Sequence, residues 1–240
     1  MMIENNPAPQ VEKVSKNIWP WILTILIAAW LIGVSILGAG WLISKEVAKQ
    51  NLGFDQPIST GPVDIEITSD KVVQGNNDAK VTVIEFADYQ CPYCGQWYTD
   101  VYPLLKSEYI DTGKVKFVYW DFAFLGAESY RSAEAAMCAN DQGKYWEYHD
   151  KLFMNQNGES QGAFSDDNLN KFASELNLDQ NKFGECMTTN LHQKQVEESL
   201  RLGTKYNVSS TPTVFINGIP IEGVMPYENY KQIIESELAK

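Results

Sequence analysis

The sequence predicts an α/β fold with a helical domain inserted between its strands and one transmembrane helix in front of it. Residues 81–87 (Val-Thr-Val-Ile-Glu-Phe-Ala) are typical of a buried strand, and a helix-periodic stretch follows closely. About ninety residues of largely helical pattern separate a second strand, 115–120, from a hairpin signal at 213–221. The uncharged apolar run 17–44 predicts the transmembrane helix.

The composition is that of an ordinary globular chain with an acidic surface. Its 240 residues are 44% hydrophobic and 21% charged, and the formal net charge is −12. Such a chain can bury a core, which argues against wholesale disorder. Its negative charge is repelled by phosphates, so we expect no nucleic-acid partner. Four cysteines, one close pair and two distant ones, are too few for a disulfide-dense small protein.

The N-terminal part divides into a short tail, 1–16, and an anchor, 17–44. At about 1.5 Å per residue, a helix of this length exceeds the roughly 30 Å hydrocarbon thickness of a bilayer. Tryptophans stand near both ends, where their rings favour the interface: Trp19, Trp21 and Trp41. The alternative is a cleaved signal peptide, but its apolar region would span only about 7–15 residues.

Residues 45–72 are expected to form a tether with a short strand. Proline, glycine and scattered polar residues interrupt any helical period there. Residues 63–67 (Val-Asp-Ile-Glu-Ile) alternate apolar and acidic side chains, which is the period of a half-buried strand. The folded domain is expected to begin at about residue 73, beside a turn at 75–78.

The strand at 81–87 leads into Cys91-Pro92-Tyr93-Cys94, and a helix is expected to start there. Proline suits the first helical position, and a residue three positions on lies on the same side, so the two sulfurs can meet. Unpaired N–H groups at a helix start stabilise a thiolate. We therefore expect Cys91 to be the nucleophile with a lowered pKa, and Cys94 to be the buried resolving thiol.

A Cys-x-x-Cys motif also occurs in zinc sites and in purely structural disulfides. Half of a zinc site would need a second ligand pair, but Cys138 and Cys186 are single, and neither His149 nor His192 forms a compact motif with them. We therefore expect no metal ligands. A purely structural disulfide would not require a strand–loop–helix junction.

A second feature surrounds Thr211-Pro212. Thr213–Ile216 is a short strand, and Asn217-Gly218 is a strong hairpin signal. A proline at the entry of a strand removes one backbone donor. If the Thr211–Pro212 bond is cis, the turn could expose the Thr211 backbone to an extended substrate, whereas an ordinary trans proline would only cap the strand.

These motifs together resemble the DsbA-like thioredoxin-fold oxidoreductases, especially membrane-tethered bacterial forms. The resemblance covers residues 73–239 and depends on three stretches: 75–79, 85–94 and 211–213. It implies a thioredoxin-like fold with a cis-Pro212 loop packed beside the dithiol. It also implies that four residues contact the substrate: Pro92, Tyr93, Thr211 and Pro212.

In this family an acid at the position of Glu85 lies beneath the dithiol and assists proton transfer to the resolving cysteine. The strand around Glu85 is apolar, so burial would raise the pKa of its carboxyl. The alternative is that Glu85 points to solvent. Ser210 and Ala123 depart from the common pattern of the family, and the Pro92-Tyr93 dipeptide leaves the redox direction open.

The resemblance divides the folded part into 73–122, a helical insertion at 123–206, and 207–240. Helical patterns in the insertion lie at 132–143, 145–155, 169–176 and 180–206, the last broken near Thr189. A final helix is expected at 227–238. His149 is expected to be structural.

Cys138 and Cys186 would each, taken singly, be an inert buried cysteine. Several relatives carry a structural disulfide in this region, which makes the pair a disulfide candidate worth about 2–4 kcal/mol. Such a bond would indicate an oxidising compartment. Two lysines precede the anchor (Lys13 and Lys16) and two follow it (Lys45 and Lys49), so counting lysines does not determine its orientation. The expected disulfide is therefore the only reason for placing the C-terminal domain outside a bacterial cell membrane.

The leading hypothesis is a thiol–disulfide oxidoreductase that oxidises dithiols of exported proteins through a Cys91–Cys94 disulfide. A redox partner would have to recycle the dithiol, and no organic cofactor is expected because the cysteine pair carries the electrons. The first alternative is a disulfide reductase or isomerase with the same dithiol. The second is a non-catalytic binding module or chaperone of the same fold.

Overall fold

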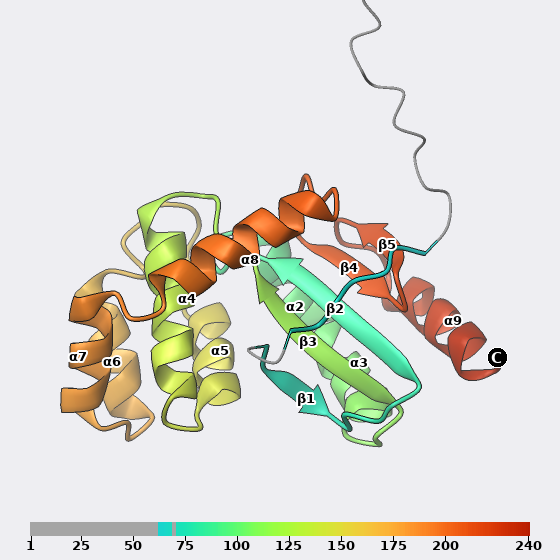
Figure 1. The fold of residues 1–240 in the computed structure, drawn as a ribbon, viewed down its shortest axis with the longest axis horizontal. Coiled ribbons are helices and arrows are strands. Elements are labelled where there is room, and N and C mark those ends of the chain that lie inside the picture. The colour runs from blue at the N-terminus through green and yellow to red at the C-terminus, as the bar shows by residue number, and fades with distance from the viewer. Residues whose placement is uncertain (1–61, 69–70) are drawn as a thin grey trace, which may run out of the picture. The chain divides into compact units, whose positions relative to one another are not determined.

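A five-stranded mixed sheet is the centre of the computed structural model, which describes residues 62–68 and 71–240 (Figure 1). Its strand order is β1-β3-β2-β4-β5. Strands β2 and β3 are parallel, and the other neighbours are antiparallel. The strands are β1 (Val73–Gly75), β2 (Val81–Ala87), β3 (Val115–Asp121), β4 (Thr213–Ile216) and β5 (Ile219–Glu222). The strands predicted at 81–87, 115–120 and 213–216, and the hairpin after the last, are confirmed, whereas β1 was not predicted.

Strand β2 occupies the middle of the sheet because its side chains can be buried on both faces. Six of its seven residues are buried, as expected for a β-branched and aromatic run between two neighbouring strands. Glu85 pairs with Tyr119 on one side and Val214 on the other. The acid thus lies well inside the sheet.

Helices from both ends of the domain cover one face of the sheet. They are α2 (Pro92–Asp100), α3 (Tyr102–Leu105), the π-helical turn η1 (Lys106–Ile110) and α9 (Tyr227–Leu238). The stretch after the dithiol is broken at Val101 because Pro103 cannot donate a backbone hydrogen bond within a continuous helix. The helix predicted at 227–238 is confirmed.

The insertion between β3 and β4 is helical, as predicted. Its helices are α4 (Ala127–Asn140), α5 (Tyr145–Met154), α6 (Asp166–Glu175), α7 (Gln180–Thr189) and α8 (Gln193–Lys205). Helix α4 begins five residues before the predicted start at Ser132. The predicted break near Thr189 is present, and Asn190 makes it with a left-handed φ of 50°. Helix α8 then returns to the sheet and packs on β3 (Figure 1).

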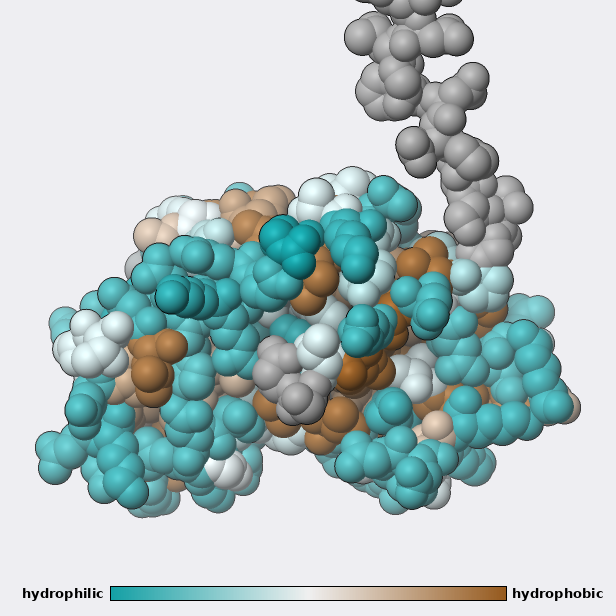
Figure 2. Space-filling view, viewed as in Figure 1, coloured by the Kyte–Doolittle hydropathy of each residue, from teal (hydrophilic) through white to brown (hydrophobic). Residues whose placement is uncertain are grey.

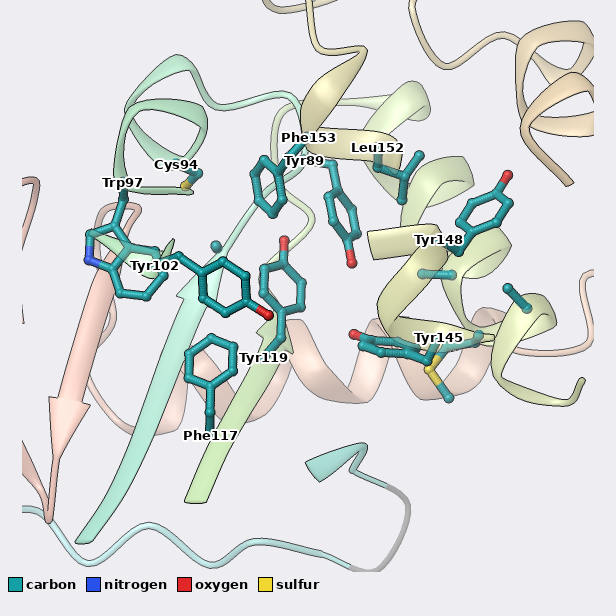
Figure 3. Close-up of a cluster of buried hydrophobic side chains, with 14 of the residues drawn as sticks. Tyr89, Cys94, Trp97, Tyr102, Phe117, Tyr119, Tyr145, Tyr148, Leu152 and Phe153 are labelled. Atoms are coloured by element: carbon teal, nitrogen blue, oxygen red, sulfur yellow. The ribbon is translucent and has the colours of Figure 1, made fainter. Parts of the chain in front are cut away.

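An aromatic core joins the insertion to the sheet. Figure 3 shows Tyr89, Tyr119 and Phe153 in contact between β3 and α5. The rings of Tyr89 and Tyr119 are stacked with centroids 4.9 Å apart. Cys94 lies at the edge of this cluster and belongs to the same buried core. The Cys94 side of the dithiol therefore packs against the buried core.

The opposite face of the sheet is covered by α8 and by residues 62–68. Val63, Ile65 and Ile67 pack on a core that contains Phe86 and Trp120. Figure 2 shows hydrophobic residues in the middle of this face between hydrophilic flanks. The expected alternation of burial is present, but the strand predicted at 63–67 is wrong: the segment crosses the sheet face instead of joining its edge, and the Val63 N–H donates to Gly218 O at 2.8 Å.

The predicted tail, anchor and most of the tether, residues 1–61, lie outside the described residues. Among residues 62–68 and 71–240, no helix is long and apolar enough to cross a bilayer. The transmembrane helix at 17–44 therefore stays a prediction.

Candidate functional site

Cys91 is the N-cap residue of α2, as the sequence predicts. Its φ of −70° and ψ of 118° are extended, and Pro92 begins the helix. Its thiol donates a hydrogen bond of 3.5 Å to the backbone oxygen of Thr211. The residue is only 5% exposed, whereas the neighbouring Tyr93 is 64% exposed. The sulfur is thus held in a shallow position beside a protruding aromatic ring.

The environment of Cys91 favours the thiolate. Its pKa is lowered to about 6, chiefly by a hydrogen bond from the Cys94 thiol. Burial opposes this shift, while the Thr211 side chain and the backbone N–H groups of Cys94 and Tyr93 reinforce it. These N–H groups are the unpaired donors of the helix start. Both Cys91 and Cys94 are free thiols in the structure.

Cys94 and Glu85 form the buried side of the site. Cys94 is fully buried, and burial followed by its interaction with Cys91 raises the pKa of its thiol well above the usual value. Glu85 is 1% exposed, and burial followed by the charge on Cys91 raises the pKa of its carboxyl. Its Oε1 has no hydrogen-bond partner among the described residues. The alternative that Glu85 faces solvent is wrong.

The Thr211–Pro212 loop closes the other side of the dithiol. The Thr211–Pro212 peptide bond is cis. The Pro212 carbonyl accepts a hydrogen bond from Gly223 N–H at 2.8 Å, and Thr213 Oγ1 donates to Ser210 O at 2.7 Å. These bonds fix the loop so that the Thr211 carbonyl meets Cys91. The structure therefore brings together all the residues predicted for substrate contact and for redox chemistry.

A buried polar network shapes the loop before the dithiol, around an acid that lies in the stretch 85–94 but was assigned no role from the sequence. Asp88 is 1% exposed and accepts hydrogen bonds from the N–H groups of Gln90, Phe124 and Leu125, and from the Ser129 hydroxyl. Burial raises the pKa of Asp88, and these bonds oppose the shift. Asp88 precedes the dithiol by three residues, and that short spacing was the available signal for its role.

Gln156 is a second residue that no sequence pattern singled out. Its Nε2 donates to the backbone oxygens of Tyr89, at 2.5 Å, and of Cys91, at 2.9 Å. Gln156 follows α5, so the helical insertion reaches across and holds the turn that carries the nucleophilic sulfur. A carbon atom added to Gly95 would lie 2.3 Å from Gln156 Oε1, so a glycine leaves room for this contact.

A second buried acid, Asp121, lies on the same sheet face as Glu85. It ends β3, is 6% exposed, and its Oδ1 has no hydrogen-bond partner among the described residues. Burial raises its pKa to about 7, against the opposing charge of Lys71. Figure 3 shows Tyr119 and Tyr145 in the same buried interior. Burial, followed by the charge on Asp121, raises the pKa of both hydroxyl groups.

Replacing Asp121 by asparagine is expected to flatten the pH dependence of stability. The folded protein holds this proton up to about pH 7 and the unfolded chain only to about its ordinary value of 3.8. The contribution of Asp121 to the free energy of unfolding is therefore fully present below about pH 4 and is lost as the pH rises through about 7. The difference between wild type and Asp121→Asn should change by on the order of 2–4 kcal/mol over that interval.

Urea unfolding at pH 4.5 and pH 8 measures this change. Glu85 and Asp88 shift in the same direction and are common to both proteins, so the comparison removes most of their contribution. The charge on Asp88 also raises the pKa of Asp121, and that interaction is part of the difference being measured. An unchanged difference at the two pH values would show that Asp121 titrates normally.

The other singled-out residues lie away from the dithiol. His149 is 1% exposed inside the aromatic core, where burial lowers its pKa, and its ring lies 4.8 Å from that of Tyr119. This placement agrees with a structural role. Cys138 on α4 and Cys186 on α7 form a disulfide, as the resemblance implied.

Comparison with known proteins agrees with this geometry. Residues 68–236 match the thioredoxin family. The chain is 33% identical over 169 residues to disulfide bond formation protein D of Bacillus subtilis, covering 69% of this chain and 76% of that protein. The crystal structure of oxidised BdbD from Bacillus subtilis superposes with a TM-score of 0.69 at 31% identity, covering 75% of this chain and 97% of that chain.

A more distant structure shares the fold alone. Wolbachia pipientis alpha-DsbA1 has a TM-score of 0.67 at 20% identity, and the match covers 73% of this chain and 94% of that chain. The matched family, the Bacillus relatives and a fold with a helical insertion all agree. The chain therefore belongs to the thioredoxin family, among its DsbA-like thiol–disulfide oxidoreductases.

Proposed function

We propose that this protein oxidises dithiols of exported proteins through a Cys91–Cys94 disulfide. A substrate thiolate attacks the Cys91 sulfur, and the Cys94 sulfur leaves as a thiolate that then takes up a proton. A second substrate thiolate then attacks the substrate sulfur bonded to Cys91 and releases Cys91 as a thiolate. Two electrons pass to the Cys91–Cys94 pair, and the substrate gains one disulfide.

The main observation that supports oxidation of substrates, as opposed to their reduction, is the pKa of Cys91, which is lowered to about 6. A group that stabilises the thiolate stabilises the dithiol relative to the disulfide, and so makes the disulfide a stronger oxidant. At pH 7, a fall from 9 to about 6 increases the population of the dithiol form by about tenfold. That factor is about 1.4 kcal/mol, or about 30 mV for a two-electron couple.

The two thiols divide the chemistry because their surroundings differ. Cys91 is stabilised as an anion and leaves readily, whereas the raised pKa of Cys94 keeps it protonated after the disulfide opens. Glu85, also with a raised pKa, supplies an acid beneath Cys94 that can deliver or accept this proton. The dithiol itself carries the electrons, so the cycle needs no organic cofactor.

The substrate fits as an extended peptide beside Cys91. The exposed ring of Tyr93 offers an apolar contact, and the backbone of Thr211, at the edge of the cis-Pro212 loop, offers hydrogen-bonding groups. Pro92 is also exposed next to the sulfur. A recycling partner must use the same opening, because Cys94 is fully buried.

We place this activity on the outer side of a bacterial cell membrane, with residues 17–44 as the single anchor. The Cys138–Cys186 disulfide supports an oxidising compartment, since such bonds rarely persist in the cytosol. The Bacillus subtilis relative is named for disulfide bond formation, a reaction that suits an oxidising compartment.

The reduction potential of the Cys91–Cys94 pair tests the direction. We expect a value toward the oxidising end, about −120 to −180 mV, by equilibration in glutathione buffers followed by thiol alkylation. The oxidised protein should also introduce disulfides into a reduced, unfolded substrate. A potential near −270 mV would instead identify a reductase.

A further inference from the structure

A cluster of sulfur, nitrogen and oxygen ligand atoms lies in the helical insertion, outside the redox site. One donor atom each from Cys138, Cys186 and His192 lie within 4.8 Å of one another. Asp141 adds a carboxylate: its Oδ2 is 2.8 Å from His192 Nε2 and 3.9 Å from Cys186 Sγ. Nothing in the proposed oxidation of substrates uses these four residues.

Three helices, α4, α7 and α8, bring the four residues together, and His192 is the N-cap residue of α8. Cys138 is on α4, and Asp141 is its C-cap residue. Cys186 is on α7, and the left-handed Asn190 reverses the chain after that helix. The Leu191 N–H then bonds to Cys186 O at 3.1 Å, which returns His192 to the side of Cys186. The cluster is therefore built by the backbone and does not depend on flexible side chains alone.

The histidine is oriented for ligation. Its Nδ1 pairs with Gln195 Oε1 at 3.1 Å, which leaves Nε2 directed at Asp141. A ligating histidine in proteins is usually held in this way by a second hydrogen bond from its other nitrogen. A surface hollow of about 290 Å³ is lined by Cys138, Cys186 and Asp141, so solvent reaches the sulfur and carboxylate side of the cluster.

In the structure the two sulfurs are bonded to each other, so they are not free to bind a cation. We propose that the dithiol form of Cys138 and Cys186 binds Zn²⁺, with His192 and Asp141 completing four ligands. Two thiolates, one imidazole and one carboxylate are a donor set that zinc accepts in tetrahedral geometry. Binding releases the two thiol protons and involves no electron transfer.

Zinc and the disulfide are thus alternative cross-links between α4 and α7. A newly made chain carries both cysteines as thiols, so the zinc form needs no reductant. A disulfide-bearing oxidant then removes two electrons from the two zinc-bound thiolates, which gives the Cys138–Cys186 bond and releases Zn²⁺. The oxidant is reduced to two thiols, which take their protons from solvent. The zinc form would hold the insertion together until that oxidation occurs.

The experiment uses the full chain with Cys91→Ser and Cys94→Ser, so that only Cys138 and Cys186 can supply thiolates. The protein is reduced, freed of reductant without oxygen, and titrated with Zn²⁺ against a chromophoric chelator. Co²⁺ serves as a spectroscopic probe of thiolate ligation. We expect one Zn²⁺ per reduced chain and none for the same chain with the Cys138–Cys186 bond formed.

Added substitutions assign the ligands. His192→Ala and Cys186→Ser should each weaken zinc binding by at least about 100-fold, and Asp141→Asn by about 10-fold. Leu191→Ala is the matched control, since Leu191 lines the same hollow, is 61% exposed and offers no ligand atom. Zinc should also slow formation of the Cys138–Cys186 bond in the parent but not in His192→Ala.

Two results would overturn the proposal: no zinc bound by the reduced parent, or equal affinity in the parent and in His192→Ala. Circular dichroism of the metal-free proteins checks that each variant is folded before titration. These measurements do not involve Cys91 or Cys94, so they stand whether or not the redox function is as proposed.

Discussion

Serine at position 91 is expected to abolish disulfide transfer, with a loss of at least about 1000-fold in the rate of substrate oxidation. Cys91 is the sulfur at the start of α2 with the lowered pKa and with Thr211 beside it. An alcohol cannot form the mixed disulfide, and Cys94 is fully buried and cannot substitute for it. Oxidation of a reduced, unfolded protein substrate measures the loss.

Alanine at position 94 is the matched control, because it keeps Cys91 but removes the resolving thiol. A peptide activated as a mixed disulfide should transfer to Cys91 and then remain attached, as mass spectrometry would show. The Cys94 thiol is the largest cause of the low pKa of Cys91, so the pH midpoint of this transfer should lie above 6. Unchanged substrate oxidation by Cys91→Ser would show that Cys91 is not the nucleophile. If the oxidation were lost but the biological function of the protein stayed intact, the non-catalytic binding-module alternative would gain support.

Loss of the Cys138–Cys186 disulfide is expected to cost about 4 kcal/mol of unfolding free energy. The two cysteines are 48 residues apart, and the chain entropy released in the unfolded state by a loop of this length gives about that value. The double variant Cys138→Ala, Cys186→Ala should show it in urea unfolding without reductant. A chelator keeps bound metal from contributing.

The single variant Cys186→Ala tests the cause. If the covalent link carries the effect, the single and double variants should lose nearly the same stability. A loss below about 1 kcal/mol in both would mean that helix packing alone holds α4 to α7, since native disulfides usually contribute more.

The sequence by itself determined the elements whose signals are local. The buried strand at 81–87, the hairpin after Ile216 and the helix at 227–238 follow from side-chain period and turn residues that neighbours in the chain supply. The placement of Cys91 at a helix start also follows locally, from a strand, a loop and a proline. The cis-Pro212 loop and the Cys138–Cys186 disulfide were predicted from the resemblance to the DsbA-like family, because no local pattern indicated them.

Tertiary structure decided the features that join distant parts of the chain. An acid in an alternating strand can face either way, and the neighbouring strands and helices bury Glu85. Residues 63–67 have the period of a strand, but burial of their apolar side needs only a sheet face, not an edge with free backbone groups.

The same holds for contacts made by single side chains. Gln156 reaches the carbonyl of Cys91 across 65 residues of sequence, and His192 meets Asp141 across 51. The type of a residue does not indicate which distant residue it will contact, because the contact depends on where the helices of the insertion dock. The spacing of His192, Cys138 and Cys186 in the chain argued against a compact cluster, yet the cluster exists because three helix ends converge in space.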